Sequence, residues 1–150
     1  SLKAIDLSGQ IKNFNKDQIS FSYRKTNFPN DLIIISVVFE GKFLNKKNIK
    51  EKQIQLTNKK KESQPSRVKT CGSTFKNPEN NKAWELIKNS NCSDLKVGGA
   101  SISPKHANFF INDGNATSSD VEKLIDKVRN RVFLKTGTKL DLEIKIVGEK

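Results

Sequence analysis

The segment TCGSTFKNP, residues 70–78, places a serine hydroxyl where it could take part in chemistry. Ser73 follows a glycine, precedes two residues that favour strands, and has the side-chain amide of Asn77 close behind it. A hydrolase triad is a weak interpretation, because no Gly-x-Ser-x-Gly elbow surrounds Ser73 and His106 is the single histidine able to act as base. The alternative is an ordinary serine beside a glycine turn.

Two charged residues and a glycine pair are further candidates. Glu143 interrupts an apolar alternation over residues 140–147, where a charge either faces solvent or serves a site. Arg24, beside Tyr23, is one of a few arginines in a lysine-rich chain, and a guanidinium can hold a carboxylate through two parallel hydrogen bonds. A plain surface arginine is the alternative. Gly98-Gly99 indicates either close backbone packing or a backbone that a ligand approaches closely.

Strands and one helix are predicted for the first 65 residues. Residues 2–14 indicate a hairpin with its turn at Ser8-Gly9. The run IIISVVF, residues 33–39, predicts a strand buried on both faces. The polar stretch 46–62 predicts a surface helix or helical linker that ends near Pro65, because proline disfavours helix at the residue before it. We expect a boundary between two structural units there.

The rest of the chain alternates strands and helices. Strands are predicted at GSTFKNP, VGGASIS, ANFFIN and LDLEIKIVG, and a short helix at KAWELIKNS. A longer helix is indicated by apolar residues on one face, which are Val121, Leu124, Ile125, Val128 and Val132. Ser119 and Glu122 suit a capping box at its start, and Gly137 suits its end. The pattern predicts an α+β unit with two helices on a mixed sheet.

The formal net charge of +12 bears on the class of ligand. Nucleic-acid binding is one interpretation, and solvated lysines with some preference for an anionic small ligand is the other. The second is favoured, because the lysines are spread along the chain and the aromatic residues do not interleave with them. We therefore expect no nucleic-acid partner. No apolar run is long enough to span a membrane.

Cysteine usage and the start of the chain set further limits. Cys71, Cys92 and His106 are too few for a Cys/His zinc site with four ligands, so no metal is expected. Two free thiols in a reducing cytosol are favoured over a disulfide. The chain starts at Ser1, contains no methionine, and is strand-like from its first residues, so we expect a fragment that lacks its N-terminal part.

Seven segments together resemble the C-terminal half of the UDP-N-acetylenolpyruvoylglucosamine reductases, flavoenzymes that make UDP-N-acetylmuramate for bacterial peptidoglycan. In chain order they are FSYRKTNF, SQP, CGSTFKNP, AWELI, VGGASISPKHANFFINDGNAT, DVEKLIDKVRNRV and LDLEIKIVG. Their order and spacing are similar to the family's and cover nearly the whole chain. The resemblance implies a cytoplasmic α+β protein. Residues 1–45 would be the tail of an FAD-binding domain, 46–65 a helical connection, and 66–150 the substrate-binding C-terminal domain.

The resemblance also implies a reaction and roles for residues. NADPH would reduce FAD, held mostly by the missing N-terminal region, and the flavin would reduce UDP-N-acetylglucosamine-enolpyruvate. Ser73 would donate the proton that completes the reduction, assisted by Arg24 and Glu143. The implied substrate-binding residues are Tyr23, Asn77 and His106.

The chain departs from the family at two positions. Ser63 and Ser93 stand near positions where family members often carry a lysine or arginine able to meet a diphosphate, and the expected substitutes are Lys60, Lys61 and Lys96. Two other functions stay open. One is a nucleotide-sugar binding module without catalysis, and the other is a basic nucleic-acid-binding domain.

Overall fold

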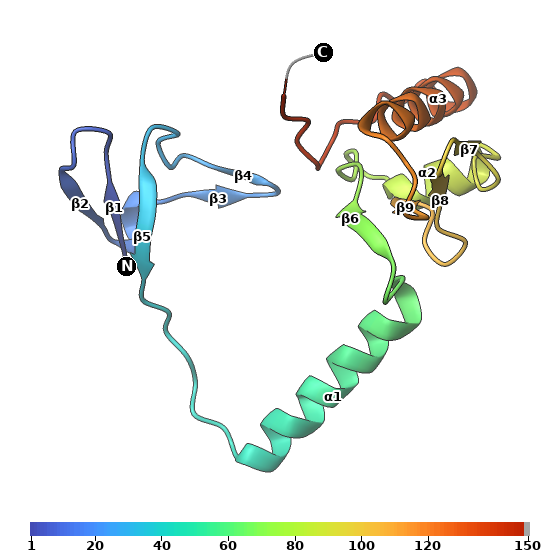
Figure 1. The fold of residues 1–150 in the computed structure, drawn as a ribbon. Helices are drawn as coiled ribbons and strands as arrows, with labels where there is room; N and C mark the ends of the chain where they lie inside the picture. The colour runs from blue at the N-terminus through green and yellow to red at the C-terminus, as the bar shows by residue number, and fades with distance from the viewer. Residues whose placement is uncertain (149–150) are drawn as a thin grey trace. The chain divides into compact units, whose positions relative to one another are not determined.

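The computed structural model describes residues 1–148, and within them the chain forms three α-helices, a short 3-10 helix and nine strands (Figure 1). The chain divides into two compact units, Ser1–Asn48 and Ile49–Lys150. The last two residues of the predicted 66–150 domain, Glu149 and Lys150, lie outside the described residues.

The first unit contains a small antiparallel sheet and a separate short hairpin. The sheet has the order β2-β1-β5, from strands β1 (Leu2–Ile5), β2 (Ile11–Phe14) and β5 (Ile33–Val37). The hairpin pairs β3 (Phe21–Ser22) with β4 (Lys25–Thr26), and the 3-10 helix spans Lys16–Gln18. The predicted hairpin over residues 2–14 is confirmed, and Gly9 in its turn has a φ of +86° that favours glycine.

The carboxylate of Asp6 fixes this first hairpin turn. Its Oδ1 accepts hydrogen bonds from Ser8 Oγ at 2.6 Å, from Gln10 N at 2.9 Å and from Ser8 N at 3.0 Å. These bonds, led by the Ser8 hydroxyl, lower the pKa of Asp6 to about 2. The folded turn therefore favours the ionised form of Asp6.

Burial of β5 differs from the prediction. The strand forms, but Ile33, Ile34 and Ile35 are 58%, 49% and 49% exposed, so the expectation of two buried faces is wrong for the described chain. The strand lies at the edge of its sheet and pairs with β1. An apolar run of this kind is typical of a strand covered on both faces, and no layer among residues 1–148 supplies that cover.

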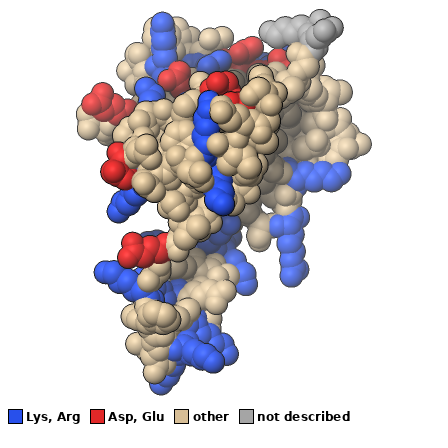
Figure 2. All heavy atoms as spheres, turned by 90° about the vertical axis from the view of Figure 1, so that its left-hand side faces the viewer, with Lys and Arg blue, Asp and Glu red and all other residues tan. Residues whose placement is uncertain are grey.

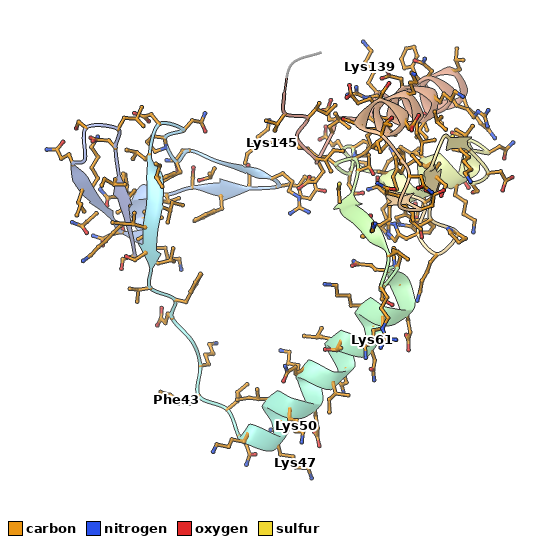
Figure 3. All side chains as sticks on the ribbon, in the orientation of Figure 1. Phe43, Lys47, Lys50, Lys61, Lys139 and Lys145 are labelled. Atoms are coloured by element: carbon orange, nitrogen blue, oxygen red, sulfur yellow. The ribbon has the colours of Figure 1, made fainter. Side chains whose placement is uncertain are left out.

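Helix α1 (Lys46–Ser63) is the predicted surface helix, and all of its residues are exposed. Lys47 and Lys50 lie near its start and Lys61 lies in its last turn (Figure 3). The helix ends where the sequence indicates, shortly before Pro65. Lysine and arginine side chains also occur in several separate places on the face drawn in Figure 2, with fewer acidic ones.

The sheet of the second unit is antiparallel throughout. Its order is β6-β9-β8-β7, from strands β6 (Lys69–Ser73), β7 (Lys96–Val97), β8 (Ala100–Ile102) and β9 (Phe109–Asn112). The α+β prediction is confirmed, but the predicted mixed sheet is wrong because every pairing runs antiparallel. Short connections between β7, β8 and β9 reverse the chain, which produces antiparallel neighbours.

Both predicted helices of the second unit form. They are α2 (Ala83–Asn89) and α3 (Ser118–Thr136), and in Figure 1 they lie beside the strands that they cover. The apolar face of α3 is buried in the core through Leu124, Ile125, Val128 and Val132. The predicted start is wrong by two residues, because Thr117 and Asp120 form the capping box, while Gly137 ends the helix as expected with a φ of +69°.

The glycine pair is a turn that packs closely against other backbone. Gly98 and Gly99 connect β7 to β8, so the predicted strand VGGASIS is divided by a hairpin turn. A Cβ on Gly99 would lie 2.5 Å from Ala116 N, and one on Gly98 would lie 2.6 Å from the carboxylate of Asp120. The interpretation of close packing is therefore correct, because the loop before α3 and its first turn occupy the space that a ligand would need.

The predicted strand LDLEIKIVG does not form among the described residues. Leu142 makes an isolated antiparallel bridge with Phe75, and residues 143–148 have no strand partner in the part of the chain that the structure describes. Ile146 and Val147 are 49% and 92% exposed. A period-two apolar pattern specifies a strand only when a neighbouring edge is available to pair with it.

Candidate active site

Ser73 lies at the end of β6, immediately after an irregularity in the strand. The pairing of β6 with β9 shifts register between Thr70 and Ser73, which is the pattern of a β-bulge. Gly72 has a φ of +84°, and its N–H donates to Thr70 Oγ1 at 3.2 Å. The bulge turns the half-buried Ser73 relative to the rest of the strand, and only glycine adopts the required backbone easily.

Glu143 lies beside this strand end, although the two residues are 70 positions apart in the chain. Glu143 N donates to Thr74 O at 2.9 Å, and Lys76 N donates to Asp141 O at 2.8 Å. Glu143 is half-buried, and its Oε2 atom is buried. Ser73 and Glu143 thus lie on adjacent segments. Two residues that act in the same reaction must lie close together in this way.

His106 lies two residues before Asn108, whose backbone carbonyl accepts a hydrogen bond from Thr74 N at 2.8 Å. The Nδ1 atom of His106 accepts a hydrogen bond from Asn108 N at 3.3 Å, and its ring packs edge-on against Phe109 with centroids 4.8 Å apart. Burial lowers the pKa of His106, and a backbone hydrogen bond opposes that change. The neutral ring is therefore favoured near pH 7. Because Nδ1 accepts from Asn108 N, the proton lies on Nε2, which can donate a hydrogen bond.

Asn77 is exposed and supports the start of α2. Its Oδ1 accepts a hydrogen bond from Ala83 N at 3.0 Å, so it satisfies one of the free N–H groups of the first helical turn. A contact with substrate stays a prediction for Asn77. The contact with Ala83 shows that its side-chain oxygen has a structural role beside any such contact.

Tyr23 and Arg24 belong to the first unit, where they form the turn between β3 and β4. Arg24 has a φ of +57°, and its guanidinium carbon lies 5.6 Å from the centre of the Tyr23 ring, a cation–π distance. The turn holds the two side chains together at the tip of a two-stranded hairpin. Their predicted site partners Ser73, Asn77, His106 and Glu143 all lie in the second unit.

A cavity of about 350 Å³ lies beside His106, and the sequence did not predict it. It is lined by Ser63, Trp84, Lys88, Ser93, Ser103, Pro104, Lys105, His106 and Ala107. Ser63 and Ser93, the two positions where a departure from the family is expected from the sequence, line the same cavity. Its cations are Lys88 and Lys105 rather than the expected lysines. Lys105 also donates to the carbonyl of Lys61 in the last turn of α1. Residues so far apart in sequence carry no signal that they share a cavity.

The described residues do not offer the glycine-rich loop that cradles a dinucleotide pyrophosphate. The adjacent glycines, Gly98 and Gly99, are packed against backbone and the Asp120 carboxylate. The described residues therefore do not fit the pyrophosphate of FAD. Among residues 1–148 there is also no cluster of ligating side chains for a metal ion, and no helix long and apolar enough to cross a membrane.

Comparison with known proteins gives consistent matches. A family model described as the C-terminal domain of UDP-N-acetylenolpyruvoylglucosamine reductase matches residues 64–147. The reductases of Rickettsia prowazekii and Pelagibacter ubique are each 43% identical to the chain, over 99% and 98% of its length, and in both cases over 50% of their own. The crystal structure of the Thermus caldophilus reductase is 30% identical with a TM-score of 0.81, covering 96% of this chain and 51% of that one.

These matches define the class by its fold, which is an α+β domain like the C-terminal domain of the reductases that the chain matches. More particularly, the chain belongs to the UDP-N-acetylenolpyruvoylglucosamine reductase family. It spans about half the length of the curated relatives that it matches.

Proposed function

We propose that this chain is the substrate-binding half of an NADPH-dependent flavoenzyme that reduces UDP-N-acetylglucosamine-enolpyruvate to UDP-N-acetylmuramate. One observation carries the proposal. Ser73 and Glu143, from distant parts of the sequence, lie on segments joined by the 2.9 Å hydrogen bond from Glu143 N to Thr74 O. Family membership and the fold support the assignment.

The chemistry needs both a hydride and a proton. When bound by a flavin-binding region outside residues 1–148, FAD reduced by NADPH would supply the hydride to one carbon of the enolpyruvyl double bond. The other carbon, next to the carboxylate, then carries negative charge and must take up a proton. A serine hydroxyl is a weak acid, so Ser73 can donate only to such a strongly basic centre and in a fixed geometry. Solvent returns the proton to Ser73, and the double bond has gained two electrons and two hydrogens.

Charged and polar groups would stabilise and orient the substrate. Arg24 can hold the substrate carboxylate through two parallel hydrogen bonds and stabilise the charge that develops there. Glu143 would orient the reacting group or assist the protonation. We assign Tyr23, Asn77 and His106 to contacts with the rest of the substrate. Lys88 and Lys105 line the cavity beside His106, and we assign them to the anionic groups of a nucleotide sugar.

A substitution at Ser73 tests the proposal in a full-length protein. In Ser73→Ala, flavin reduction by NADPH should stay near the wild-type rate, because that step needs no proton from Ser73. Flavin reoxidation by the enolpyruvyl substrate should slow about a hundredfold or more, as expected for a lost general acid. Ser73→Cys should retain part of the reoxidation rate, since a thiol can donate a proton.

The control is Ser101→Ala, which removes another half-buried serine from the same sheet, in β8. It should leave both half-reactions unchanged. Equal slowing of both half-reactions in Ser73→Ala would mean that Ser73 supports the fold, and slowing of neither would remove it as the donor. Stopped-flow flavin absorbance separates the two steps.

A binding module without catalysis is the second candidate for the chain by itself. Two observations favour it. The chain spans about half the length of its relatives, and residues 1–148 contain no pyrophosphate loop. Binding of UDP and of DNA at two salt concentrations distinguishes it from a nucleic-acid-binding domain. Contacts with many phosphates weaken steeply as salt rises, whereas a nucleotide-sugar site loses much less affinity.

A further inference from the structure

Asn108 is a buried polar residue whose side chain contacts the strand end that carries Ser73. It is 4% exposed and lies one residue before β9. Its Oδ1 accepts a hydrogen bond from Phe75 N at 3.0 Å, and its Nδ2 donates to Phe75 O at 2.8 Å. A primary amide offers one acceptor and paired donors, so this side chain pairs with the Phe75 backbone as a neighbouring strand would.

The backbone of Asn108 extends the same connection. Its carbonyl accepts from Thr74 N at 2.8 Å, and its N–H donates to His106 Nδ1 at 3.3 Å. On the other side of the strand end, Thr74 O accepts from Glu143 N at 2.9 Å. Asn108 therefore joins its own segment, which carries His106, to the end of the Ser73 strand, and Thr74 in turn joins that strand end to the segment of Glu143.

The position of Phe75 explains why such a connection is needed. Regular pairing of β6 with β9 ends at Ser73, yet Phe75 is 1% exposed and its backbone cannot turn to water. Its N–H and carbonyl are hydrogen-bonded to the Asn108 side chain. On either side of Phe75, Thr74 O accepts from Glu143 N and Lys76 N donates to Asp141 O. Loss of the amide would leave a buried donor and acceptor without partners, so residues 74–76 would move away from that geometry.

We propose that Asn108 is a positioning residue that holds Ser73 and Glu143 in the register required for proton donation. The inference rests on the proposed function, because it assigns Asn108 to the step in which Ser73 donates its proton. Asn108 acts through the backbone of residues 74 and 75 and not by touching the reacting atoms. Its loss should therefore slow protonation more than it disturbs the rest of the enzyme.

Two variants in a full-length protein test this role, with one matched control. Asn108→Ala removes both side-chain bonds. Asn108→Asp keeps an acceptor for Phe75 N but sets a carboxylate against Phe75 O, and only its protonated form can donate there. The control is Asn112→Ala, at the other end of β9, where the Asn112 side chain also holds two backbone N–H groups, those of Gly114 and Ala116.

The expected results separate positioning from general stability. Both Asn108 variants should reoxidise flavin about tenfold or more slowly at pH 8 while reduction by NADPH stays within about twofold, and the control should be normal in both steps. Asn108→Asp should recover reoxidation as the pH falls, relative to wild type, because its acid form restores the second hydrogen bond. Hydrogen exchange should be faster in peptides covering residues 74–76 and 141–143, and unchanged in α3.

Several results would overturn the inference. These are equal slowing of both half-reactions, the same slowing in Asn112→Ala, no pH-dependent recovery in Asn108→Asp, or unchanged exchange at residues 141–143. If Asn108→Ala does not fold, Asn108→Asp assayed across the pH range decides alone. If the wild-type protein does not use the enolpyruvyl substrate, the proposed function fails, and hydrogen exchange then shows separately whether Asn108 holds the two segments.

Discussion

Gly99→Ala should destabilise the second unit strongly, although it adds a single methyl group. The new Cβ would lie 2.4 Å from Asp113 Oδ1, 2.5 Å from Ala116 N and 2.9 Å from Asn115 C. The last two atoms belong to backbone that leads directly into α3, so they cannot rotate away as a side chain could. The loop over residues 113–116 must therefore move.

The size of the effect follows from two terms. Forcing a methyl group into a packed site costs about 1–3 kcal/mol. Moving the loop also weakens the 3.0 Å hydrogen bond from Asp113 N to Gly99 O, which contributes about 1 kcal/mol. A loss of about 2 kcal/mol or more lowers the melting temperature of a domain this size by about 8 °C or more.

Differential scanning calorimetry measures the change, and Trp84 fluorescence assigns it to the second unit, because Trp84 is the single tryptophan. Gly41→Ala is the matched control, since no atom lies within 4 Å of its added Cβ, and its melting should not fall. A Gly99→Ala melting temperature within about 2 °C of wild type, given the usual slope of about 4–8 °C per kcal/mol, would refute the packing argument. Unchanged stability with lost UDP binding would instead support a ligand at the glycine pair.

Three further predictions concern the thiols, the histidine and the arginine. Both cysteines are free, as the sequence predicts, and a disulfide reagent should label the exposed Cys71 in the native chain but the buried Cys92, whose pKa is raised by burial, only after unfolding. Labelling of both in the native chain would contradict the burial of Cys92. Because burial lowers the pKa of His106, the unfolded state binds its proton first, so the free energy of unfolding should fall as the pH drops from about 7 through about 6.5. His106→Gln should lose this part of the pH dependence in urea titrations, and an identical profile would show that His106 does not cause it. Arg24→Lys in a full-length protein should slow flavin reoxidation by substrate at least about tenfold, or about 1.4 kcal/mol, because lysine cannot make the two parallel bonds. An unchanged rate in stopped-flow absorbance would return Arg24 to an ordinary surface role.

Local pattern was sufficient where short-range chemistry decides the structure. The apolar face of α3, its end at Gly137, the hairpin at Gly9 and the end of α1 before Pro65 all agree with the sequence. Each depends on helix periodicity, on a glycine conformation or on the restriction that proline imposes. The motif around Ser73 likewise indicated the family, which the matches confirm.

The sequence pattern gave wrong predictions where the structure depends on a neighbouring strand or layer. The apolar run of β5 predicted burial, yet its faces are exposed among the described residues, and LDLEIKIVG predicted a strand that makes one bridge. In both segments the residue types favour a strand. They do not determine whether another strand is present to pair with it, or another layer to cover it. The alternation that predicts a strand cannot supply its partner.

By itself the sequence determined the family, the helices and the identity of the candidate residues. Only the tertiary structure decided that Glu143 lies beside the Ser73 strand end, that Gly98-Gly99 is closed by the loop before α3, and that Lys88 and Lys105 share one cavity. The role of Asn108 also emerged only there, because nothing in the motif KHANF distinguishes a buried amide that holds a strand from an exposed one. The physical reason is that local propensity acts over a few residues, whereas a site is made by contacts between residues 30 to 70 positions apart, which only packing brings together.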